Sequence, residues 1–221
     1  SFKNSEIYSE LIKEKIIFLK LEWNKLIDIV SNDLIEGKVI GWFQGSMEFG
    51  PRALGARSII ADPRNINMQK KVNLKIKFRE SFRPFAPSIL EENFKSFFNI
   101  KIKSPYMLFT ANIKEKYKLI PYLNNGKYIG LQKLNEIRSK FPAITHLDYS
   151  SRLQTVNKKN NKKFYDLIKN FKLKTNCPMI LNTSFNVRGE PIVRSPKDAL
   201  NCFFNTDLDI LVIGNYYIKK S

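Results

Sequence analysis

The chain has 221 residues and a formal net charge of +18, from 38 lysines and arginines against 20 acidic residues. This length allows one sizeable core, or one domain with an appendage. The two cysteines give neither a disulfide framework nor a zinc-ligand spacing. The lysines are scattered, so most of the charge is interpreted as solvated surface, which makes nucleic acid an unlikely partner. No signal peptide or membrane-length apolar run is recognisable, and a cytoplasmic location without membrane contact is expected.

Two helices are predicted at the start of the chain. Apolar residues recur at helical spacing in two sets, and Gly37 is a suitable helix stop; the sets are Ile7, Leu11, Ile12, Ile16 and Leu19, then Trp23, Leu26, Ile27, Val30 and Leu34. We interpret residues 1–36 as a helical connector that packs against the rest of the chain or against a further domain.

The first motif follows a predicted strand at Val39–Phe43. The loop that comes next is rich in glycine and carries Pro51, Arg52 and Arg57. Glycines allow close approach of a ligand to the backbone, and forked guanidinium groups suit phosphate or carboxylate. The alternative is a surface turn with solvated arginines.

The second motif spans Lys75–Pro87, after a helix predicted at Ile66–Lys75. Its cations, Lys75, Lys77, Arg79 and Arg83, alternate with apolar residues, as in a strand or extended loop that presents charge on one face. We expect Phe78, Phe82 and Phe85 to be buried, which would hold the cations at the rim of an apolar floor, as in an anion pocket. A solvated basic edge strand is the alternative.

The third motif spans Pro142–Val156 and holds Arg152 and the only histidine, His146, close to Asp148. Such a pair is compatible with acid–base chemistry, but a lone histidine is more often a structural hydrogen-bonding group. Before this motif we predict a short helix at Leu90–Phe98 and a strand at Tyr106–Ile113, whereas Lys114–Ser139 has no recognisable pattern.

The fourth motif follows a predicted strand at Pro178–Leu181. Its short amide and hydroxyl side chains, Asn182, Ser184 and Asn186, suit phosphate oxygens or the edge of a nucleotide. Further helices are predicted at Phe164–Phe171 and, capped by Ser195 with Pro196 in first position, through Phe204; a last strand is predicted at Leu208–Ile213. Helices and strands without strict alternation indicate an α/β fold of α+β character, with an open mixed sheet.

Together the motifs supply several cations and several neutral donors, without an obvious general base. This inventory favours binding and activation of anionic, phosphorylated substrates by positioning and charge stabilisation. No metal-ligand cluster is visible, so no metal site is predicted.

These motifs also resemble a known family. Gly41-Trp-Phe-Gln-Gly, Met47-Glu-Phe-Gly-Pro-Arg-Ala-Leu-Gly, Lys77-Phe-Arg-Glu, Phe82-Arg-Pro-Phe-Ala-Pro, His146-Leu-Asp, Arg152-Leu-Gln-Thr-Val and Asn182-Thr-Ser-Phe-Asn look like the C-terminal domain of the O-carbamoyltransferases. That family carbamoylates nodulation factors, aminoglycosides and cephalosporins. The sequence departs from its pattern at Ser46, often a basic residue, and at Ala56, often asparagine.

The resemblance implies a YrdC-like domain over residues 37–221. Such a domain uses carbamoyl phosphate and ATP with Mg²⁺ as substrates to form carbamoyl-adenylate, with release of phosphate and pyrophosphate. A separate N-terminal domain, in the same chain or another subunit, then transfers the carbamoyl group to an acceptor hydroxyl. The isolated chain would catalyse only the partial reaction.

The resemblance also assigns expected site residues. Lys77, Arg83 and Arg52 are the expected catalytic residues. Substrate or nucleotide binding is expected from these three with Arg79, Arg152, Asn182, Ser184 and Asn186. Two alternatives remain: an RNA- or nucleotide-binding module without turnover, and an inactive partner subunit that stabilises an acceptor domain.

Overall fold

An eight-stranded mixed sheet organises the chain, for which the computed structural model describes residues 1–119 and 136–220. Its strand order is β1-β10-β9-β2-β3-β8-β4-β7, and β5 and β6 form a separate antiparallel pair. The strands are β1 (Leu19–Lys20), β2 (Ile40–Phe43), β3 (Arg57–Ala61), β4 (Ala86–Leu90), β5 (Thr110–Asn112), β6 (Ser150–Arg152), β7 (Gln154–Val156), β8 (Met179–Ser184), β9 (Ile210–Ile213) and β10 (Tyr216–Lys219).

The mixed character of the sheet comes from two parallel pairs, β2 with β9 and β4 with β7, among otherwise antiparallel neighbours. Strands β2 and β9 are buried along their whole length, which explains their uninterrupted apolar sequences. The predicted open, mixed sheet is confirmed.

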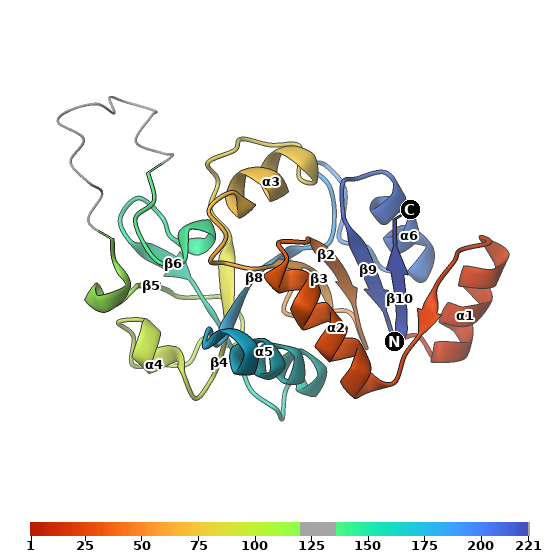
Figure 1. Cartoon of the computed structure of the whole chain (residues 1–221), viewed down its shortest axis with the longest axis horizontal. Coiled ribbons are helices and arrows are strands. Elements are labelled where there is room, and N and C mark those ends of the chain that lie inside the picture. The colour runs from red at the N-terminus through yellow and green to blue at the C-terminus, as the bar shows by residue number, and fades with distance from the viewer. Residues whose placement is uncertain (120–135, 221) are drawn as a thin grey trace.

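Helices cover this sheet and pack against one another. They are α1 (Asn4–Lys13), α2 (Trp23–Ile35), α3 (Met68–Lys75), α4 (Phe94–Phe97), α5 (Lys162–Thr175) and α6 (Pro196–Phe204). Helices α2 and α5 contact each other, as Figure 1 shows, and α6 packs against β9 and β2. The predicted cap of α6 is confirmed, because Ser195 Oγ accepts a hydrogen bond from the Asp198 amide at 3.2 Å.

The predicted helix boundaries need correction in two places. The first helix ends at Lys13, because Lys15 has a φ of 54° and Ile16 N–H donates to Leu11 O at 2.9 Å, which closes the helix. Leu19 then lies in β1, which pairs with β10. The second error is Leu90, which ends β4, so that the following helix covers Phe94–Phe97 only.

Other predicted segments are shorter or less regular than expected. The predicted Tyr106–Ile113 strand is reduced to β5. In the third motif, Pro142–Ile144 forms a 3₁₀ turn, η3, before His146. In the unassigned segment, η1 (Glu115–Tyr117) precedes an antiparallel bridge between Lys118 and Ser139. Residues 120–135 lie outside the described part.

The N-terminal helices share the core of the chain. Leu11, Leu26, Val30 and Leu34 are fully buried in the same cluster as the sheet. No helix among the described residues has the length and apolar character that a bilayer span requires.

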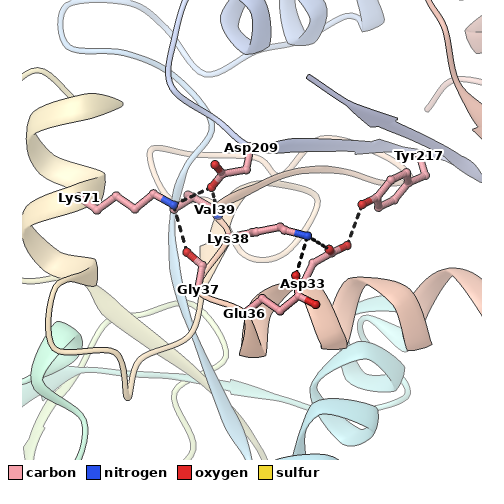
Figure 2. Close-up of polar contacts among 8 residues, drawn as sticks. All are labelled: Asp33, Glu36, Gly37, Lys38, Val39, Lys71, Asp209 and Tyr217. Carbon is pink, nitrogen blue, oxygen red and sulfur yellow. Dashed lines mark hydrogen bonds and ion pairs between the residues drawn. The ribbon is translucent and has the colours of Figure 1, made fainter. Parts of the chain in front are cut away.

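Two carboxylates, the buried Asp33 and the partly exposed Asp209, fix α2 and α3 to the sheet (Figure 2). Asp33 of α2 accepts hydrogen bonds from Lys38 Nζ at 2.6 Å and from the Tyr217 hydroxyl at 2.9 Å. Asp209 accepts from Val39 N–H at 2.7 Å and from Lys71 Nζ of α3 at 2.8 Å. These contacts hold the start of β2 between two helices.

The two partners of Lys38 differ in burial. The Asp33 side chain is 8% exposed and that of Glu36, 2.8 Å from the same ammonium, is 61% exposed. Hydrogen bonds to both carboxylates raise the pKa of Lys38, whereas burial first and then the bond to Asp33 raise the pKa of Tyr217.

Replacement of Asp33 by alanine is expected to lower the free energy of unfolding by about 2–4 kcal/mol, because it removes two hydrogen bonds and leaves the buried Tyr217 hydroxyl without its acceptor. Chemical denaturation measures the change. The control is Glu36→Ala, which removes the exposed partner of the same lysine and should have a much smaller effect. Equal effects of the two substitutions would contradict the claim that the buried Asp33 contacts stabilise the fold.

Candidate functional site

One cavity lies where three loops meet the carboxyl end of β8. Its volume is about 480 Å³. The lining residues are Pro51, Arg52, Ala53, Arg79, Arg83, Pro84, Phe85, Ala86, Met107, His146, Arg152, Asn182, Thr183 and Ser184. The cavity therefore brings together residues from all four sequence motifs.

Four arginines dominate the chemistry of this cavity. Arg52 comes from the loop after β2, Arg79 and Arg83 from the loop after α3, and Arg152 from the end of β6. No carboxylate is among the lining residues, and none of these arginines forms an ion pair within residues 1–119 and 136–220. An anion would find several uncompensated guanidinium groups there.

The arginines are close enough to perturb one another. Burial, and then the charge of Arg52, lower the pKa of Arg152. Burial, and then the charge of Arg83, lower the pKa of Arg79 to about 10. A bound anion would relieve the mutual repulsion of these guanidinium groups.

The loop that carries Arg52 contains a carboxylate, that of Glu48, which determines the shape of the loop. Glu48 Oε1 accepts hydrogen bonds from the amides of Leu54 and Ala56, both at 2.7 Å, and of Arg57 at 3.2 Å. Three amides on one oxygen fold residues 48–57 into a closed loop. Glu48, the acidic residue of the first motif, therefore has a structural role that was not predicted from the sequence.

Glycine is required at position 55 of this loop. Gly55 has a φ of +101°, and a Cβ atom there would lie 2.2 Å from Phe164 Cδ1. Phe164 is fully buried in α5, so the loop is pressed against that helix.

Arg57 does not contribute to the cavity, although its side chain was expected to suit an anion. Its guanidinium donates to the carbonyls of Gln44 and Ala56, both at 3.0 Å, and of Gly45 at 3.1 Å. The group lies over the Phe43 ring, 3.5 Å from its centroid, and burial lowers its pKa to about 10. The residue is 1% exposed and joins the loop to β2.

Lys77 also lies outside the cavity lining, beneath the end of β8. Its ammonium donates to the carbonyl of Ser184, to Asn186 O at 2.8 Å and to Asn186 Oδ1 at 2.7 Å. The residue is 3% exposed, and burial, followed by the charge of Arg79, lowers its pKa to about 7. In this structure Lys77 fastens the Ser184–Asn186 turn, and the expectation that it contacts substrate stays a prediction.

The chain reverses between Lys77 and Arg79. Phe78 has a φ of 48°, which sends Lys77 inward and lets Arg79 reach Asn73 Oδ1 at 2.7 Å, with its guanidinium 5.0 Å from the Phe85 ring centroid. The expected burial of three phenylalanines holds for Phe85 only; Phe78 and Phe82 are 53% and 44% exposed. The cause is this reversal, which replaces the alternation of an extended strand.

The polar residues of the fourth motif divide between two roles. Asn182 and Ser184 line the cavity. Asn186 does not, because its Oδ1 accepts from Lys77 and from Ser184 Oγ, the latter at 2.7 Å. Asn186 therefore orients Ser184.

His146 and Met107 line the cavity beside the arginines. The Asp148 carboxylate accepts from the Ser150 amide at 3.0 Å, and no hydrogen bond or ion pair joins it to His146 in the described part of the chain. Burial lowers the pKa of His146 below its usual 6.5. The Asp148 charge raises this pKa, and the Arg152 charge lowers it. Met107 belongs to none of the four sequence motifs. Its φ of 55° places its backbone in the left-handed region.

A larger groove of about 670 Å³ lies on the other side of Phe78. Two carboxylates, Glu190 and Asp198, line this groove. In the part of the chain that the structure describes, Arg194 is the one cation in the lining of this groove, whereas the lining of the first cavity has four arginines and no carboxylate. The arginine cavity is therefore the candidate site for an anion. Among the described residues no cluster of histidine, cysteine, aspartate or glutamate is suited to hold a metal ion.

His146 offers a direct test of anion binding, because it is the only histidine in the sequence. Since its pKa is lowered, the imidazole should be neutral at pH 7 and gain its proton only in more acidic solution. A phosphate bound beside Arg152 should offset the cationic repulsion and raise this pKa. A pH titration of the imidazole signals by NMR, without and with saturating ATP, measures the shift.

Arg152→Ala should raise the same pKa without ligand, since it removes one repulsive charge. A His146 pKa that ATP leaves unchanged, under conditions where calorimetry shows ATP to be bound, would place the anion elsewhere.

Comparison with known proteins places the chain in a family. Residues 31–220 match the family described as carbamoyltransferase C-terminus. Nodulation protein NolO of Bradyrhizobium diazoefficiens is 42% identical over 210 residues, which cover 90% of this chain and 35% of that protein. The 3'-hydroxymethylcephem-O-carbamoyltransferase of Amycolatopsis lactamdurans is 29% identical over 194 residues, 88% of this chain and 33% of that enzyme.

A solved structure supports the fold. Full-length HypF matches with a TM-score of 0.52 at 17% sequence identity, over 89% of this chain and 22% of HypF. The predicted YrdC-like α/β fold is thus confirmed. The chain spans about a third of the length of the curated relatives that it matches. Because the family match includes nearly the whole sheet and all four motifs, the chain belongs to the carbamoyltransferase C-terminus family.

Proposed function

We propose that this chain forms carbamoyl-adenylate from carbamoyl phosphate and ATP. The observation that carries the proposal is the cavity with four arginines and no lining carboxylate, in a member of the carbamoyltransferase C-terminus family. Carbamoyl phosphate and ATP together bring roughly six negative charges into one site, and only a cluster of cations can offset their repulsion.

The reaction balances with one water molecule. Water cleaves carbamoyl phosphate to carbamate and phosphate; a carbamate oxygen then attacks the α-phosphorus of ATP, and the bond to the β-phosphate breaks. The products are carbamoyl-adenylate, phosphate and pyrophosphate. Mg²⁺ would enter with the phosphates of ATP, as part of the substrate.

Arg52, Arg83 and Arg152 come from separate loops, so each can hold a different phosphate oxygen. Such guanidinium groups would position the two substrates and stabilise charge at the transferred phosphorus. Ser184 lines the cavity beside them with its hydroxyl donated to Asn186 Oδ1, and Lys77 supports this turn through the Ser184 and Asn186 carbonyls.

Transfer of the carbamoyl group to an acceptor is assigned to a further domain. The relatives are about three times as long as the matched region, which leaves room for an acceptor-binding domain in them. The related cephem enzyme is named for an O-carbamoyl transfer, and the HypF structure is described as phosphate- and nucleotide-bound. Both support the proposal, the second through the fold alone.

Arg52→Ala, Arg83→Ala and Arg152→Ala should each reduce carbamoyl-phosphate-dependent pyrophosphate release by about tenfold to more than a hundredfold. Each removes charge-assisted hydrogen bonds of about 1.5–3 kcal/mol, and 1.4 kcal/mol is a factor of ten. Arg83→Lys should also be impaired, because a point charge cannot reproduce a two-pronged contact. Initial rates with purified variants, combined with thermal melts, measure the effects.

The control is Lys159→Ala, which removes a solvent-exposed lysine outside the cavity and should leave the rate unchanged. A comparable loss in this variant would point to diffuse surface charge. Wild-type chain that releases no pyrophosphate but binds RNA with a steep salt dependence would favour the alternative of a binding module.

A further inference from the structure

One buried amide side chain holds the loop that carries two of the four cavity arginines. Asn73 of α3 is fully buried and lies outside the cavity lining. Its Oδ1 accepts from Arg79 Nε at 2.7 Å, and its Nδ2 donates to the carbonyls of Ser81 at 3.1 Å and of Arg83 at 2.7 Å. The Asn73 carbonyl, close to the end of the helix, accepts from the Arg79 amide at 3.0 Å. Both polar ends of the Asn73 side chain are therefore used by this loop.

These partners determine which way the Asn73 amide points. The Nε–H of a guanidinium can only donate and a backbone carbonyl can only accept, so a reversed amide would place like groups against each other at all three contacts. Aspartate, which has nearly the same size, would keep the acceptor but would have no donor for the two carbonyls. Leucine would have neither. The contacts therefore require asparagine at this position.

The two arginines are held in different ways. The bond to Nε fixes the Arg79 side chain itself. The bond to the Arg83 carbonyl fixes the backbone from which the Arg83 side chain leaves, directly before the rigid Pro84. Repulsion would otherwise favour larger separations, since the charge of Arg83 is one of the causes that lower the pKa of Arg79. A single buried amide can thus set the spacing of two guanidinium groups.

We propose that Asn73 is a positioning residue for ATP, which acts through Arg79 and Arg83 and does not touch the ligand. The proposal rests on the proposed function, because it takes the arginine cavity as the site where ATP binds. Donors that are already in place bind a ligand without the cost of ordering them. Loss of the Asn73 side chain should therefore weaken ATP binding as if both of these arginines were impaired. The contributions of Arg52 and Arg152, which come from other loops, should be unaffected.

Calorimetric titration of the 221-residue chain with ATP and Mg²⁺ tests the proposal in three backgrounds. In the wild-type background, Asn73→Ala should raise Kd by about tenfold or more, the size expected when charge-assisted hydrogen bonds are lost. In a chain that already carries Arg79→Ala and Arg83→Ala, the same replacement should change Kd by less than about threefold, because the groups that Asn73 positions have been removed. In the Arg152→Ala background, the wild-type factor should persist. Equal factors in all three backgrounds would indicate general loosening and overturn the proposal.

Gln69→Ala is the matched control. Gln69 lies one turn before Asn73 in α3, and its amide donates to the Phe82 carbonyl of the same loop at 2.8 Å. This contact lies nearer to the surface and does not involve an arginine, so Kd for ATP should stay within about twofold of the wild-type value. A loss as large as that of Asn73→Ala would assign the effect to disturbance of the whole loop and count against a specific role of Asn73.

Hydrogen exchange in the wild-type chain gives a test that needs no variant. The Asn73 side-chain amide should exchange slowly with solvent in the free chain, and more slowly still with saturating ATP and Mg²⁺. The reason is that a ligand bound to the two arginines would hold their loop against α3. NMR measures both rates. An exchange rate that bound ATP leaves unchanged would overturn the proposal, also if Asn73→Ala does not fold.

Binding and turnover separate this proposal from the proposed function. The predicted pattern of ATP affinities, without pyrophosphate release by the wild-type chain, would keep the role of Asn73 and reject the proposed reaction. Pyrophosphate release together with an Asn73→Ala effect that is independent of Arg79 and Arg83 would keep the reaction and reject that role. A wild-type chain that does not bind ATP would overturn both.

Discussion

The structure depends on one electrostatic constraint: four arginines must be held around one cavity that has no carboxylate in its lining. Like charges at such separations repel, and the partial burial of Arg79 and Arg152 adds the cost of desolvation. The positions of these side chains must therefore be imposed by contacts elsewhere in the fold. The loops that carry Arg52 and Arg79 have such contacts at their bases.

Those contacts are polar and largely buried. Glu48 closes the first loop by accepting three amide hydrogen bonds, and Arg57 joins that loop to β2 through backbone carbonyls. Lys77 fastens the end of β8, and Asn73 orients Arg79. Within the described residues, Arg52, Arg83 and Arg152 therefore keep their side-chain donors for a ligand, whereas Arg79 donates to Asn73. Stability and anion binding are thus assigned to different charged residues of the same motifs.

Much of the fold could be predicted from sequence, because local signals and tertiary packing agree. The apolar runs of β2, β8 and β9 and the Ser195–Pro196 cap of α6 are signals of this kind. Prediction failed where a long-range contact decides the local structure. Ile16 and Leu19 continue the helical spacing of α1, yet pairing with β10 takes Leu19 into a strand.

The candidate site shows the same division. Sequence motifs named most of the residues that line the cavity, but not which cation faces it and which supports it. Lys77 and Arg57 have the same residue chemistry as their neighbours, and only the left-handed Phe78 and the burial of Arg57 over Phe43 determine their directions. The two apolar residues that became exposed, Phe78 and Phe82, follow from that reversal. The buried contacts of Asn182 come from two other strands and a loop, so no local sequence pattern could reveal them.

The central claim is that the arginine cavity is where the phosphorylated substrates bind. A crystal structure of the chain with a non-hydrolysable ATP analogue and carbamoyl phosphate would test it most directly. The account predicts phosphate groups within hydrogen-bond distance of Arg52, Arg83 and Arg152. Well-defined density for both compounds in the groove beyond Phe78, with the arginine cavity holding only water, would contradict it.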